Sequence, residues 1–207
     1  FILMILCFFS GGALALFASR AGSLTKGGLF APISREGALV FNNLFLTAAC
    51  ATVLIGTLYP LIVEALTGET ISVGAPFFTV TFDPLMVPLL LAVTFGPLLA
   101  WKRGDIVAVA QRLMAAACVA LAAVVLLLAI NQRGPWLAPF GIGLGVWLIM
   151  GALTEIAYRV RFREAAPAET WRRLSNLPRA AYGTTLAHAG LGLAVIGILG
   201  LGSIAAL

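Results

Sequence analysis

Uncharged, apolar stretches alternate with short charged segments along the whole chain. Six stretches each approach the roughly 20 residues that a helix needs to cross the hydrocarbon of a bilayer. They lack the strict alternation of apolar and polar residues that is typical of barrel strands. The pattern predicts an all-α, polytopic transmembrane helix bundle that forms one region over residues 1–207. The six predicted spanning helices cover residues 1–18, 39–63, 85–101, 113–130, 140–158 and 182–207.

Composition supports this fold class. Of the 207 residues, 61% are hydrophobic and 10% are charged, and the mean hydropathy is +1.07. Such a chain cannot cover a water-exposed surface, which excludes a soluble enzyme, a disordered chain and a disulfide-rich secreted module. Cys7, Cys50 and Cys118 fall within predicted spans and are interpreted as small apolar packing residues. Because both ends lie inside apolar runs, we expect the chain to be part of a longer protein.

The basic residues predict how the helices are oriented. Connections 19–38, 102–112 and 159–181 hold 12 of the 13 Lys and Arg, and Arg133 alone lies in the other two connections. Basic residues resist translocation, so these three connections are predicted to be cytoplasmic and loop 64–84 extracytoplasmic. Anionic lipid headgroups next to the basic loops account for the net charge of +5. The charge therefore predicts contact with the lipid bilayer and no nucleic-acid partner.

His188 is the only histidine, and it lies within the last predicted span. Nine residues of helix separate it from Arg179, which places it about 13 Å inside the membrane. An ionisable residue at that depth is a candidate functional residue. The small residues around it suit an axial haem ligand, because a flat macrocycle could approach the helix. They are Thr184, Thr185, Ala187, Ala189, Gly190 and Gly192.

The alternative for His188 is a hydrogen bond across a helix interface, with the glycines allowing close packing. Two further features also have two interpretations. Glu155, four residues before Arg159, predicts an interfacial ion pair, or else a group that handles protons or lies beside haem propionates. The segment 67–78 is either a membrane-surface anchor or, through exposed Phe77 and Phe78, a surface for a hydrophobic partner.

Several motifs, in the same order and spacing, resemble the CcmF family of cytochrome c maturation proteins. The resemblance covers essentially the whole chain. It rests on FNN at 41–43, GTLYP at 56–60, ISVGAPFF at 71–78, PLMVP at 84–88, GP at 96–97, WK at 101–102, LPRAAYG at 177–183 and LAHAG at 186–190.

The resemblance implies a multi-pass protein of the bacterial cytoplasmic (inner) membrane that belongs to a haem lyase (cytochrome c synthase). Such a protein attaches haem covalently to apocytochrome c outside that membrane, with a haem chaperone and other cytochrome c maturation proteins as partners. His188 matches a membrane histidine that binds haem b in this family, and the haem b could reduce the incoming haem. The second ligand and a tryptophan-rich haem-handling segment are expected outside these 207 residues, with most of the active site.

Two other functions remain open from the sequence. A cytochrome b-like electron carrier without lyase activity would use the same histidine. A secondary transporter would account for Pro60, Pro84, Pro88 and Pro97 as breaks in spanning helices. Few polar residues within the spans could line a substrate path, which argues against transport.

Overall fold

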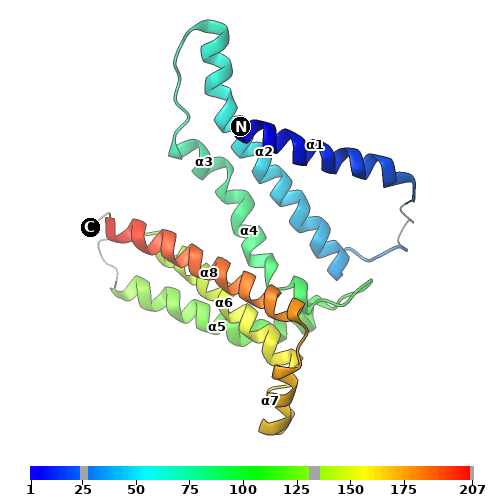
Figure 1. Ribbon diagram of the computed structural model, residues 1–207. Helices are drawn as coiled ribbons and strands as arrows, with labels where there is room; N and C mark the ends of the chain where they lie inside the picture. The colour runs from blue at the N-terminus through cyan, green and yellow to red at the C-terminus, as the bar shows by residue number, and fades with distance from the viewer. Residues whose placement is uncertain (24–27, 131–135, 206–207) are drawn as a thin grey trace.

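The computed structural model of the chain describes residues 1–23, 28–130 and 136–205, and within them every regular element is a helix (Figure 1). This confirms the predicted all-α, polytopic membrane bundle. Lys26 and Arg133, which entered the charge argument, and the end of the last predicted span lie outside the described residues. The elements are α1 (Ile2–Arg20), η1 (Ala21–Ser23), α2 (Arg35–Thr67), α3 (Ala75–Thr81), α4 (Asp83–Val93), η2 (Gly96–Leu98), α5 (Ile106–Ile130), α6 (Ala138–Arg159), α7 (Pro167–Ser175) and α8 (Arg179–Ala205).

Five of the described helices are long and apolar enough to cross a bilayer, namely α1, α2, α5, α6 and α8. A sixth span results if α3 and α4 are counted together. The axes of Ala75–Thr81 and Asp83–Leu98 differ by 47° at the break between them. Where the sequence predicted a single spanning helix over residues 85–101, the structure therefore has the second arm of a bent helix pair.

Prolines explain the shape of this segment. Pro84 begins α4 in the first turn after the bend, where its missing N–H is tolerated. At the other end, α4 stops at Val93 because the ring of Pro97 cannot follow a helical carbonyl four residues earlier. The chain makes one 3₁₀ turn, η2, and becomes extended at Leu99. Residues 99–101 are thus not helical, contrary to the prediction.

Most other helices extend beyond their predicted limits, because charged residues were taken as boundaries although they can occupy a helix outside the hydrocarbon. Helix α2 has 33 residues and is about 50 Å long at 1.5 Å per residue. Ser34 caps its start, where the hydroxyl accepts a hydrogen bond from the Gly37 N–H at 3.0 Å, and left-handed Gly68 caps its end. Asp105 caps α5 in the same way, accepting from the N–H groups of Val107 and Ala108.

Helix α6 lies at the centre of the better packed half, between α5 and α8 (Figure 1). Its backbone touches that of α8 where two glycines face each other. A Cβ on Gly145 would lie 2.7 Å from the Gly192 carbonyl oxygen, and one on Gly192 would lie 2.6 Å from the Gly145 carbonyl oxygen. Small residues permit this approach, which strengthens van der Waals contact between helices in a membrane. By contrast, no residue of α1 whose side chain is described is buried.

Helix α7 was not predicted and lies in the basic connection 159–181. Glu169 pairs with Arg172 at 2.7 Å and with Arg173 at 2.8 Å. The hydrogen bond from Arg173, aided by the charge of Arg172, holds the pKa of Glu169 below its usual value. The Tyr182 hydroxyl at the start of α8 donates to the Leu174 carbonyl, which ties α7 to the bundle.

Replacing Gly192 by alanine should loosen the α6–α8 pair. The new Cβ would lie 2.6 Å from the Gly145 carbonyl oxygen and 2.8 Å from Ile149 Cγ1, so the helices must separate. We expect a loss of about 1–3 kcal/mol, the usual cost of overpacking, measured as a lower thermal midpoint in detergent. Gly190→Ala is the matched control because a Cβ there meets no atom within 4 Å. Equal midpoints for the two variants would contradict this packing.

Candidate functional site: a cavity lined by His188

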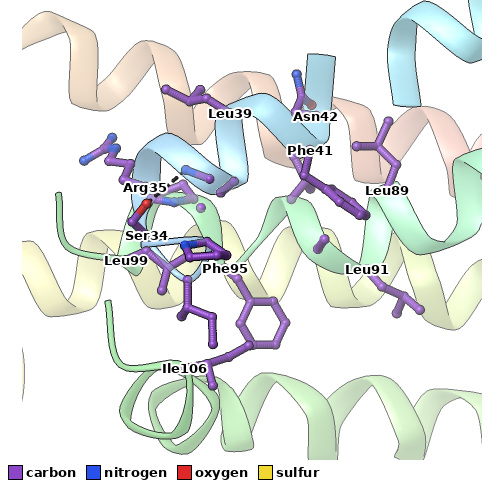
Figure 2. A pocket seen from close by; sticks show the side chains of 18 of the residues that line it. Ser34, Arg35, Leu39, Phe41, Asn42, Leu89, Leu91, Phe95, Leu99 and Ile106 are labelled. Carbon is purple, nitrogen blue, oxygen red and sulfur yellow. Dashed lines mark hydrogen bonds between the residues drawn. The ribbon is translucent and has the colours of Figure 1, made fainter. Parts of the chain in front are cut away.

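An apolar cavity of about 730 Å³ lies between α2, α4, η2 and α8. Figure 2 shows part of its wall, including Phe41 from α2, Leu89 and Leu91 from α4, and Phe95 from the turn that follows. Helix α8 contributes Thr184 and His188. The volume of the cavity falls within the range of about 300–1,000 Å³ that is typical of small-molecule sites. Such sites are usually apolar with a few polar groups.

Two loops close one end of the cavity. The N–H of Arg35 donates to the Ala100 carbonyl at 3.0 Å, and that of Gly104 donates to the Ile33 carbonyl at 2.7 Å. Glu36 accepts the N–H of Lys102 at 2.7 Å and pairs with its ammonium at 3.4 Å. Lys102 has a φ of 65°, and the carboxylate bond helps to hold that left-handed turn. The start of α2 is thereby fixed against the chain that follows η2.

Among the described residues of the cavity wall, Arg35 is the one Lys or Arg. Its guanidinium lies 5.1 Å from the centre of the Trp101 ring, a distance typical of a cation–π contact. Gly37 is required nearby because a Cβ would run into the Pro32 carbonyl. Arg35 and Gly37 could not be recognised as cavity residues from the sequence, because they are distant from His188 along the chain. The FNN and PLMVP motifs do contribute, because Phe41, Asn42 and Pro88 line the cavity.

His188 lies where two faces of α8 meet. Thr184, one turn before it, lines the cavity with it, whereas Thr185 is buried and Gly192 packs on α6. The His188 side chain is half-buried and makes no hydrogen bond with any residue that the structure describes. The alternative of a satisfied interhelical hydrogen bond therefore has no support among the described residues. Within the described part of the chain, no hydrogen bond engages the imidazole, which lines the cavity.

The small residues around His188 have different roles. Gly192 allows the close approach to α6 and does not form an open slot, which corrects that part of the sequence interpretation. Gly183 and Gly190 border open space, since a Cβ on either would meet no atom within 4 Å. The Thr184 hydroxyl donates to the Ala180 carbonyl at 2.9 Å, so its polar group is satisfied within the helix.

Glu155 forms the predicted ion pair, since the Arg159 Nη2 and Nε lie 2.6 and 2.9 Å from its Oε1. The carboxylate is, however, buried within the protein. Glu155 is only 2% exposed, and its Oε2 makes no hydrogen bond with any described residue. This burial could not be inferred from the spacing of Glu155 and Arg159 alone.

In segment 67–78 the structure corrects the interpretation that depended on exposed Phe77 and Phe78. Phe77 and Phe78 are half-buried in α3 and pack on α2, where a Cβ on Gly56 would lie 2.7 and 3.0 Å from their rings. They are thus not the exposed pair on which a partner surface was predicted. The packing role of the cysteines is also not seen: Cys7, Cys50 and Cys118 lie in helices, but each is exposed.

A tryptophan links the cavity wall to the bundle core. The Trp147 indole N–H in α6 donates to the Leu91 carbonyl at 3.1 Å. Leu91 lies in the last turn of α4, where carbonyls lack helical partners because the helix ends. The Trp147 ring also contacts the Phe95 ring, with 6.0 Å between their centres. One side chain therefore holds two residues of the cavity wall against α6.

The fold and the site define a polytopic helical membrane protein with a histidine in the wall of an apolar cavity. The chain is 62% identical over 199 residues to the cytochrome c-type biogenesis protein CycK of Rhizobium meliloti and 58% identical over 199 residues to CycK of Bradyrhizobium diazoefficiens. It is 33% identical over 206 residues to CcmF of Escherichia coli. Each match covers 96% of this chain. Across this segment the chain belongs to the CcmF family of cytochrome c-type biogenesis proteins.

The matched segment is a minor part of each relative. It covers 29% of the first CycK, 30% of the second and 29% of the Escherichia coli CcmF. No family model matches the chain, and no solved structure does. The geometry of the His188 cavity therefore comes from this structure alone.

Replacing Trp147 by phenylalanine should detach the end of α4 from α6. The aromatic ring is kept, but the Leu91 carbonyl loses its indole donor and retains only the Thr94 hydroxyl at 3.3 Å. We expect a loss of about 0.5–1.5 kcal/mol, the usual net contribution of one hydrogen bond, measured by thermal unfolding in detergent. Trp136→Phe is the control, since Trp136 is 72% exposed. If Trp147→Phe is as stable as that control, the hydrogen bond does not hold the cavity wall.

Proposed function

We propose that the chain is part of the membrane component of a cytochrome c haem lyase, and that His188 is an axial ligand of a haem b. The observation that carries the proposal is the half-buried His188 imidazole, which makes no hydrogen bond with a described residue and lines an apolar cavity of about 730 Å³. Family membership supports the coarser part of this function, a role in cytochrome c maturation.

The residues around the cavity suit a haem. Neutral imidazole is a common axial ligand, and an apolar wall excludes water from the iron. Phe41, Leu89 and Phe95 supply apolar surface, and Arg35 at the wall offers a cation for an acidic propionate. A bound haem b supplies one-electron chemistry. The part of this chain is to orient the macrocycle through His188 and to exclude water.

The whole function requires more than these residues. His188 is the only histidine in the 207 residues, so a second axial histidine comes from elsewhere in the protein. We place the protein in the bacterial inner membrane, with haem, apocytochrome c, a haem chaperone and other maturation proteins as partners. The electron passed through haem b would prepare the incoming haem for attachment to apocytochrome c outside the membrane.

Substitution of His188 by alanine in the complete protein should remove most of the haem b absorbance while leaving membrane insertion intact. One axial nitrogen is lost, and neither Thr184 nor Thr185 can replace an imidazole. The measurement is the reduced-minus-oxidised optical spectrum per mole of purified protein. Added imidazole is expected to restore part of the low-spin signal because the vacated space can admit it.

Leu186→Ala is the matched control for this experiment. Leu186 is on the same helix, two residues away, and is 70% exposed. Its replacement should leave the haem spectrum as in the wild type. A wild-type low-spin spectrum in His188→Ala would exclude His188 as an axial ligand.

The proposed orientation gives a separate prediction. A reporter fused after Thr70 should be exported, and reporters fused after Arg103 or Arg163 should remain cytoplasmic, because the basic connections resist translocation. Paired alkaline phosphatase and fluorescent protein fusions measure this. Cytoplasmic activity at Thr70 would reverse the proposed topology.

A further inference from the structure

Glu155 carries a charge where the membrane bundle offers little to solvate it. The residue is 2% exposed and lies in α6, which packs between α5 and α8. Arg159 occupies Oε1 with two donors, at 2.6 and 2.9 Å. The second oxygen, Oε2, is also buried, and no described residue donates to it. A buried carboxylate with one unused oxygen is costly, so a donor for Oε2 is expected.

The neighbouring groups on α8 limit what that donor can be. The Thr185 hydroxyl is buried but already donates to the Ala181 carbonyl at 3.1 Å. His188 follows Thr185 by three residues, so the two side chains are neighbours on the helix surface. Gly145 meets Ile196 and Gly192 meets Ile149, so α6 and α8 run in opposite directions. Six residues beyond the Ile149–Gly192 contact, Glu155 is level with the α8 turn that holds Thr185 and His188. His188 makes no hydrogen bond with a described residue, so among the described residues an acceptor without a donor and an imidazole without a partner lie at the same level of the interface.

An imidazole that binds a metal through one ring nitrogen usually donates its other N–H to a carboxylate, a carbonyl or a water. That hydrogen bond fixes the tautomer and the ring orientation, and it makes the ligand more basic. Because His188 lies between the cavity face and the α6 face of α8, one residue can serve both the cavity and Glu155. The ion pair with Arg159 alone does not account for Oε2, since it engages only Oε1.

We propose that Glu155 is the positioning residue of His188: its Oε2 accepts the second imidazole N–H, directly or through one water, and the carboxylate lowers the reduction potential of the bound haem. This inference rests on the proposed haem ligation by His188. A nearby negative charge and a more basic ligand both stabilise the ferric state. Glu155 would thereby make the haem b a stronger reductant.

The test is an equilibrium redox titration of haem b in the complete protein carrying Glu155→Gln. The amide keeps the size of the side chain but removes the charge. At the ambient potential where the wild type is half oxidised, we expect the ratio of ferric to ferrous haem to fall about tenfold, a rise in midpoint potential of about 59 mV for one electron. The ferric low-spin EPR spectrum should shift as well, because it reports on hydrogen bonding of the axial imidazole.

Glu164→Gln is the matched control, since it makes the same change at an exposed residue in the connection that follows α6. Its potential and EPR spectrum should equal those of the wild type. Glu155→Asp, which keeps the charge but withdraws both oxygens by one methylene, should shift the potential in the same direction by less. It also decides the question if Glu155→Gln is not recovered from membranes.

The outcomes separate this inference from the proposed function. Haem bound through His188 with wild-type potential and EPR spectrum in the Glu155 variants would overturn the role of Glu155 and leave the ligand assignment standing. A haem spectrum insensitive to His188→Ala would instead overturn the ligand assignment itself. A shift in Glu164→Gln as large as in Glu155→Gln would show a general effect of surface charge and also refute the inference.

Discussion

The close approach of α6 and α8 at Gly145 and Gly192 is the constraint on which the rest of the bundle depends. Lipid tails are as apolar as the side chains, so moving a side chain from lipid into a helix interface gains little free energy. Helices in a membrane therefore associate through van der Waals contact and hydrogen bonds. Helix α6 presents a glycine to each of its three neighbours. Gly145 faces α8, Gly143 faces Val124 of α5, and Gly151 faces Thr94 after α4. At Gly145 the depth of the contact is limited by the Gly192 carbonyl, which cannot change rotamer, whereas Gly143 and Gly151 make room for the side chains of Val124 and Thr94. The positions of the neighbouring helices are therefore all referred to α6.

This arrangement gives α8 two different faces. Gly192 fixes one face of α8 against α6. His188 lies one turn earlier, at the edge of that contact. The neighbouring face borders the cavity made with α2 and α4. That cavity exists because α4 ends early and is held at its last turn by the Trp147 hydrogen bond to Leu91. A continuous straight helix through residues 85–101 would have no free carbonyl at Leu91 for Trp147 to bind.

Features set by local sequence could be predicted, whereas those set by packing could not. Apolar length predicted the membrane bundle, and a lone histidine within a span singled out His188. The same reasoning missed the 47° bend between Ala75–Thr81 and Asp83–Leu98, because α3 lies in the segment that was predicted to be a loop. It also missed the early end of α4, because the hydropathy of residues 85–101 does not show that the helix stops before Pro97. It also placed Phe77 and Phe78 on the surface, because only the tertiary fold brings them to Gly56. Helix α7 was missed because a short polar helix has no membrane-length signal.

Glu155 shows why spacing and burial must be considered together. Four residues separate it from Arg159, and this spacing predicts an ion pair whether the pair is in water or in the bundle. In water such an ion pair contributes little to the free energy of unfolding. Buried beside α8, the same carboxylate must be satisfied at both oxygens, and Arg159, which is 34% exposed, reaches only one of them. The unsatisfied Oε2 needs a hydrogen-bond donor. Across the interface, α8 carries the one histidine of the chain, and an imidazole N–H can be that donor. The sequence around Glu155 predicts only a common ion pair. The contact that Gly145 and Gly192 allow between α6 and α8 gives this carboxylate a particular neighbour.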